Sequence, residues 1–159
     1  MGHMRNASIT SRRKGFTLIE LLIVIAIIGI LIGVAVPIYK SSLRKANEAA
    51  AVATLNAIRV AEANYVMDHK GQYGTFRQLF EEGQLDKRMN HDQPHDRGYV
   101  FVITLIAKSA DRAATFSVNA NPEQSQGIGA TGRNFYYMDP ESGICFSNTG
   151  PATAADDTL

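Results

Sequence analysis

The sequence predicts an α+β protein in which a long N-terminal α-helix packs on a small antiparallel β-meander. Three observations predict this class. Residues 16–38 form an apolar run long enough for a membrane-spanning helix, residues 39–69 place small and bulky side chains at helical spacing, and residues 98–147 contain several β-rich segments separated by turn residues. The 159 residues leave room for one small domain beside the apolar run.

The first segment, residues 1–15, is interpreted as a leader peptide. All four of its charged residues are basic, whereas the remainder of the chain has 12 basic and 15 acidic residues. That remainder has no basic patch large enough to make nucleic acid the main partner. Residues 1–3 have the pattern of an expression-vector remnant before a second start at Met4.

The second segment, residues 16–38, is apolar except for Thr17 and Glu20. A helix of this length, rising about 1.5 Å per residue, would extend roughly 35 Å and cross the hydrocarbon core of a bilayer. A secretory signal peptide would have an apolar region of only about 7 to 15 residues. Glu20 counts against both this signal peptide and a permanent signal anchor, because a carboxylate costs on the order of 3 kcal/mol near the centre of a spanning helix and less near an end.

The stretch Lys14-Gly15-Phe16-Thr17-Leu18-Ile19-Glu20, with the basic residues before it and Pro37 after the apolar run, resembles the type III signal of type IV prepilins and their pseudopilin relatives. In that family a dedicated peptidase cuts after the glycine and methylates the new N-terminus. The resemblance implies that Gly15 ends the leader, that Phe16 becomes the N-terminal residue, and that Glu20 is the family's assembly glutamate. It also implies a pilin-like fold.

Glu20 lies four residues after Phe16, so a helix places its carboxylate on the same side as the amine that cleavage would create. An acidic side chain in the first turn also suits the positive end of the helix dipole. In an oligomer, Glu20 of one subunit can instead neutralise the Phe16 amine of a neighbour, which removes two isolated charges from hydrocarbon. We therefore predict that Glu20 acts in subunit assembly.

Gly29 and Gly33 form a G-x-x-x-G pair, which lets helix backbones approach closely in lipid, although chance also produces such pairs. Pro37 lacks an amide donor and disfavours helix at Val36. In related filaments the helix is loosened between the corresponding glycine and proline. Residues 29–37 are therefore either extensible backbone or a tolerated kink in a membrane helix.

Residues 39–69 are predicted to continue the helix with two apolar faces. One face is a stripe of mainly small residues: Leu43, Ala46, Ala50, Ala53, Ala57, Val60, Ala61 and Asn64. The other is bulkier and is interrupted by Arg59 and Glu62; it consists of Val52, Leu55, Ile58, Tyr65 and Val66. A helix that covers one core needs one such face, so we expect the bulky face to pack on the chain's own domain and the small-residue face to contact neighbouring subunits.

Residues 70–97 are expected to form a linker loop with one short helix, which Thr75 caps. Residues 98–147 are expected to form the antiparallel sheet, with strands at 98–107, 113–119, 133–138 and 143–147. A strong turn signal, Asp139-Pro140-Glu141-Ser142-Gly143, separates the last two strands. Residues 148–159 are expected to form a flexible tail.

Catalytic and metal-binding signals are weak. The stretch His91-Asp92-Gln93-Pro94-His95-Asp96 could hold a metal, but Pro94 prevents a regular helix from aligning its histidines, and a solvated loop is the simpler interpretation. Cys145 is the only cysteine, so the chain has no intrachain disulfide, and its position between two apolar residues favours a buried thiol over a nucleophile. We predict no enzyme, no cofactor and no metal.

The resemblance implies a structural subunit of a type IV pilus, a fimbrium. It would be held in the inner membrane by one pass, processed by prepilin peptidase and polymerised through its helix by an ATPase-powered assembly platform. A pseudopilin of type II secretion is the nearest alternative; major pseudopilins usually carry an acidic C-terminal calcium loop, whose pattern is absent around Asp156 and Asp157. A signal-anchored binding protein that never polymerises is the alternative of another class. Adhesion, motility, DNA uptake and electron transport are all compatible tasks.

Overall fold

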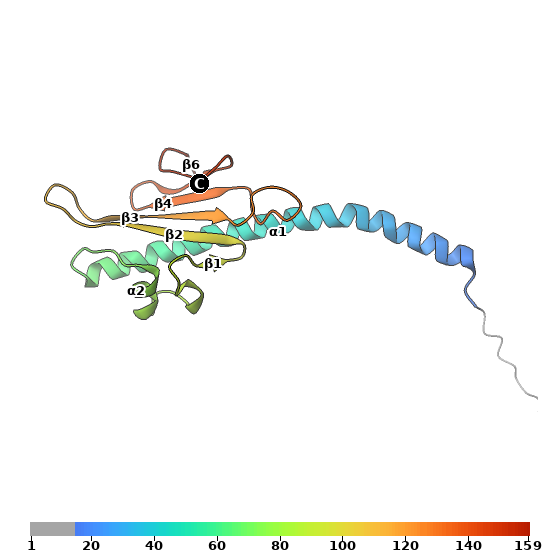
Figure 1. Cartoon of the computed structure of the whole chain (residues 1–159), viewed down its shortest axis with the longest axis horizontal. Coiled ribbons are helices and arrows are strands. Elements are labelled where there is room, and N and C mark those ends of the chain that lie inside the picture. Colours follow the sequence, from blue (N-terminus) through green and yellow to red (C-terminus); the bar gives the residue numbers. More distant parts are fainter. Residues whose placement is uncertain (1–14) are drawn as a thin grey trace, which may run out of the picture. The chain divides into compact units, whose positions relative to one another are not determined.

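The computed structural model describes residues 15–159. The predicted leader, apart from Gly15, lies outside the described residues. The chain divides into two compact units, residues 1–39 and 40–159, which are treated separately. Helix α1 (Leu18–Asp68) belongs to both units and is continuous from one to the other (Figure 1).

In the first unit, the apolar side chains of α1 have no covering from the rest of the described chain. Leu18, Ile30 and Val34 are 79%, 70% and 60% exposed. Among the described residues, α1 is the one helix long and apolar enough to cross a membrane. The helix also continues through Val36 and Pro37, so the expectation that helix is disfavoured at Val36 is wrong for this chain. A proline removes only one amide donor, and a long helix can retain its course on either side of that gap.

The second unit contains one antiparallel sheet whose six strands follow chain order. The strands are β1 (His95–Asp96), β2 (Tyr99–Ile106), β3 (Thr115–Pro122), β4 (Phe135–Asp139), β5 (Gly143–Ser147) and β6 (Asp157–Thr158). The α+β class predicted from the sequence is confirmed. The registers are regular: Val118 of β3 lies opposite Met138 of β4, and Tyr136 of β4 lies opposite Phe146 of β5.

The last segment differs from the flexible tail expected for residues 148–159. It returns to the sheet as β6, which pairs with β5. Ala152 is buried, and its carbonyl accepts a hydrogen bond of 2.9 Å from the side-chain amide of Asn119. The amide of Leu159 donates to the carbonyl of Ile144 at 2.9 Å. The small and acidic composition concealed this pairing, because the bonds to Ile144 and Ala152 use backbone groups that every residue carries.

The core of the second unit lies between the sheet and one face of α1. Burial alternates strictly along β3, because successive side chains of a strand point to opposite faces. On α1 the fully buried Leu55 and Ile58 come from the bulky face, whereas Ala53 and Ala57 of the small-residue face are exposed. Ala61 is the exception: the sequence placed it on the small-residue face, but it is 1% exposed and packs beside Tyr65 and Leu79.

Two short helices follow α1 in the chain and precede strand β1. The α-helix α2 (Phe76–Glu81) begins as predicted at Thr75, whose hydroxyl accepts from the Gln78 amide while the Gln78 side chain accepts from the Thr75 amide. This reciprocal capping satisfies two donors at the helix start. The 3-10 helix η1 (Lys87–Met89) follows and buries Met89. The linker is thus more ordered than a plain loop, and it includes β1.

Replacing Gly132 with alanine is expected to destabilise the second unit by about 2 kcal/mol or more, as overpacking of a close-packed core does. A Cβ at this position would lie 2.6 Å from Cζ of Tyr99, a fully buried ring whose hydroxyl donates to the Asn134 carbonyl at 2.9 Å. Chemical denaturation measures the effect. Gly150→Ala is the control, because a Cβ there meets nothing within 4 Å; equal stability of the two variants would contradict the expectation.

Candidate processing and assembly site

The proposed cleavage bond lies in an open, non-helical segment before α1. Phe16 is 87% exposed, and a Cβ built on Gly15 would meet no other atom within 4 Å. Residues 15–17 have no regular secondary structure, and α1 begins at Leu18. Peptidases cut preferentially where the backbone is exposed and outside regular secondary structure, as it is in this segment.

Thr17 and Glu20 form a capping box at the start of α1. One carboxylate oxygen of Glu20, Oε2, accepts hydrogen bonds from both the amide and the hydroxyl of Thr17 at 2.8 Å. In return the Thr17 hydroxyl accepts from the Glu20 amide at 3.3 Å. The pattern Thr-x-x-Glu before an apolar run is the sequence signature of this arrangement. The capping role of Thr17 was not predicted from the sequence, although this signature is present in it.

The capping box places the Glu20 carboxylate beside the backbone that cleavage would alter. Because the Glu20 carboxylate accepts a hydrogen bond from the Thr17 amide, it is held one residue along the backbone from the Phe16 nitrogen. Both bonds engage Oε2, and the other oxygen of this exposed carboxylate, Oε1, has no hydrogen-bond partner among the described residues. A carboxylate accepts several hydrogen bonds at once, so Glu20 can retain its helix cap while it meets an ammonium group.

The other predicted assembly residues lie along the exposed half of α1. A Cβ added to Gly29 or to Gly33 would meet nothing within 4 Å. Neither glycine is therefore needed for packing within the described chain. Pro37 lies inside the helix, two residues before the boundary of the first unit.

Glu62 is a buried carboxyl group that the sequence had marked only as an interruption of the bulky face. It is fully buried in α1; Oε2 accepts from the Gly74 amide at 2.9 Å, and Oε1 has no partner among the described residues. Burial raises the pKa of Glu62 to about 7, and the Gly74 bond only partly opposes this effect. Its periodic position with Leu55 and Ile58 was the signal that could have revealed the burial.

The histidine-rich loop is largely engaged in ion pairs. His95 Nδ1 lies 2.7 Å from Glu123 Oε1, and Arg88 Nη1 lies 2.8 Å from Asp96 Oδ1. No group of three metal-ligating side chains occurs in residues 15–159. Cys145 is buried within β5, and burial raises the pKa of its thiol, which disfavours the reactive thiolate.

The sequence of the N-terminal segment matches a known family. The model of the prokaryotic N-terminal methylation motif matches residues 10–36. This match includes Gly15, Phe16, Glu20, Gly29 and Gly33. Residues 10–36 thus have the sequence pattern of a prokaryotic N-terminal methylation motif.

Curated relatives narrow this class. The chain is 52% identical over 60 residues to a type IV narrow pilus major component of Thermus thermophilus, covering 38% of this chain and 52% of the relative. It is 37% identical over 73 residues to a type IV major pilin protein of Myxococcus xanthus, covering 46% and 33%. It is 44% identical over 57 residues to a type IV major pilin protein of Neisseria gonorrhoeae, covering 36% and 34%. These matches support the type IV pilin family, as the sequence predicted, and the chain spans between about a third and a half of the length of these relatives.

Proposed function

We propose that the chain is a structural subunit of a type IV pilus. The observation that carries the proposal is the conjunction of a methylation motif over residues 10–36 with an entirely uncovered apolar span at the start of α1. Cleavage between Gly15 and Phe16 by a prepilin peptidase frees the N-terminus. The helix anchors the subunit in the inner membrane before assembly and forms the filament core afterwards.

Assembly exchanges lipid contacts of α1 for helix contacts. Because lipid tails are as apolar as leucine, this exchange gains little from the hydrophobic effect and depends on close packing and paired charges. We therefore propose that an assembly machine drives the process; in the type IV pilin family this is an inner-membrane platform with an ATPase. The exposed small residues Ala53 and Ala57 extend the candidate contact surface into the second unit.

Two other functions compete with this proposal. A pseudopilin of type II secretion shares all N-terminal features and would form a short filament beneath the cell surface. A signal-anchored binding protein would keep the bond between Gly15 and Phe16 intact. No enzymatic activity is proposed, since the relatives are named as pilins and fimbrial proteins.

Mass spectrometry of the N-terminal peptide tests the proposal when membranes and sheared surface filaments are analysed separately. An N-methylated Phe16 terminus abundant in the sheared fraction supports the pilus subunit. The same terminus confined to membranes supports the pseudopilin. An intact peptide from Arg12 to Glu20 would discard all processed-pilin functions.

Replacing Gly33 with leucine is expected to lower filament yield roughly tenfold or more, because a bulky side chain keeps helix backbones apart. Membrane insertion and the fold of the subunit should not change, since a Cβ at Gly33 meets nothing within 4 Å. Ile32→Leu is the matched control, with a similar volume on the same turn. Filament yield from sheared cells and subunit content of membranes provide the two readouts. Equal yields for both variants would remove Gly33 from the proposed contact.

A further inference from the structure

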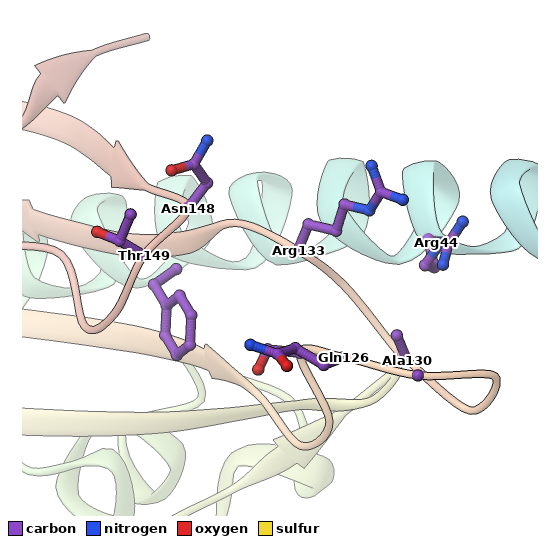
Figure 2. Close-up of a pocket in the computed structure, with 9 residues that line it drawn as sticks. Arg44, Gln126, Ala130, Arg133, Asn148 and Thr149 are labelled. Atoms are coloured by element: carbon purple, nitrogen blue, oxygen red, sulfur yellow. The ribbon is translucent and has the colours of Figure 1, made fainter.

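A polar hollow of about 560 Å³ lies in the second unit, away from the processing and assembly residues. Four segments line it: α1, the connection between β3 and β4, the first residue of β4, and the residues after β5 (Figure 2). The labelled side chains are Arg44 from α1, Gln126, Ala130 and Arg133 from the connection, and Asn148 and Thr149 from the segment after β5. Its volume lies within the usual range of small-molecule sites.

The side chains that line the hollow carry positive charge and no negative charge. Its lining contains two arginines and no acidic side chain. Neither the Arg44 nor the Arg133 guanidinium makes an ion pair or a hydrogen bond with any residue in the range 15–159. The side chains of Gln126 and Asn148 likewise have no partner within that range. These groups are available to a ligand.

Contacts outside the hollow hold together the two segments that carry the arginines. The Glu48 carboxylate, one turn after Arg44 on α1, accepts from the Arg133 backbone amide at 2.8 Å. The side-chain amide of Asn47 donates to the Thr131 carbonyl at 2.9 Å. These bonds attach the connection to α1 through backbone groups, so both guanidinium groups remain unpaired.

We propose that this hollow binds a phosphate monoester carried on a small polar organic group. Two guanidinium groups match the charge and the fork geometry of a phosphoryl dianion. The partly buried ring of Phe135, which also lines the hollow, offers an apolar wall to the organic group. The amides of Gln126 and Asn148 supply donors and acceptors for its hydroxyls. The site is independent of whether the chain polymerises.

Isothermal titration of the full chain in detergent micelles tests the proposal with glucose 6-phosphate, inorganic phosphate and glucose as probes. Glucose 6-phosphate is expected to bind, and Arg44→Gln and Arg133→Gln are each expected to weaken it by roughly tenfold or more, as loss of a charge-assisted hydrogen bond does. Arg59→Gln removes the same charge from an exposed position of α1 outside the hollow, and it should leave binding unchanged. Thermal unfolding confirms that all three variants are folded.

The three probes test separately how the phosphate and the organic group of the ligand contribute to binding. Tighter binding of glucose 6-phosphate than of inorganic phosphate supports the contribution of Phe135 and the amides, whereas equal affinities would overturn that part. Binding of glucose at the affinity of its phosphate would overturn the role of the arginines. An equal loss in Arg59→Gln, or no binding of either phosphate, would overturn the site itself.

Discussion

Filament yield is expected to fall roughly a hundredfold when Glu20 is replaced with alanine, while cleavage after Gly15 continues. The variant leaves the Phe16 amine without a counter-ion in an apolar environment, and removing one partner of a buried pair costs on the order of 3 kcal/mol or more. Quantification of sheared filaments measures assembly. Mass spectrometry of the Phe16 terminus measures processing in the same cells.

The capping box supplies the control for this experiment. Thr17→Ala removes the hydroxyl that bonds Oε2 of Glu20 but retains the carboxylate. Loss of a cap costs only about 1 kcal/mol of helix stability, and the charge that pairs with the amine remains. Filaments should therefore persist in Thr17→Ala. Wild-type assembly of Glu20→Ala would show that the carboxylate serves only as a helix cap.

Replacing Glu62 with glutamine is expected to abolish a pH dependence of stability in the second unit. The pKa of this carboxyl group is raised by burial from 4.5 to about 7 in the folded chain. Between these two values the folded state binds more protons than the unfolded state, so stability falls as the pH rises and then becomes level above about 7. Glutamine cannot ionise. The free energy of unfolding of the variant relative to wild type should therefore rise by on the order of 3 kcal/mol between acidic and mildly alkaline pH.

Denaturant unfolding of both chains at a series of pH values measures this difference. Comparing the variant with wild type cancels the titrations that the two chains share. Glu141→Gln, the same chemical change at an exposed turn, is the matched control. A constant offset for Glu62→Gln would mean that the carboxyl group titrates normally in the folded chain.

The sequence was sufficient where one local pattern dictates one element. Thr75 and Gln78 predict the start of α2. The alternating burial of side chains along β3 follows from the alternation of polar and apolar residues in its sequence. The exposed position of Ala53 and Ala57 also followed from helical spacing. These features depend on neighbours within a few residues, which the sequence lists directly.

Features that depend on distant partners were not predictable in the same way. Pairing of β6 with β5 needs backbone groups that composition does not distinguish. The burial of Glu62 depends on the Gly74 amide, 12 residues away, which arrives only after the chain has turned back on α1. The hydrogen bond from the Arg133 amide to the Glu48 carboxylate joins groups 85 residues apart in the chain. Charge and spacing along one segment do not reveal such contacts.

The meander also has a kinetic consequence. Each strand pairs with the next strand in the chain, so hairpins close short loops and lose little entropy as they form. The core residues of α1 lie much farther along the chain from the strands they pack with: Leu55 and Met138 share one core. Contacts of high sequence separation are the slow ones to form. Docking of the helix on a sheet that grows hairpin by hairpin would therefore limit the folding rate of the second unit, and substitutions at Leu55 would slow folding more than those at the β4–β5 turn.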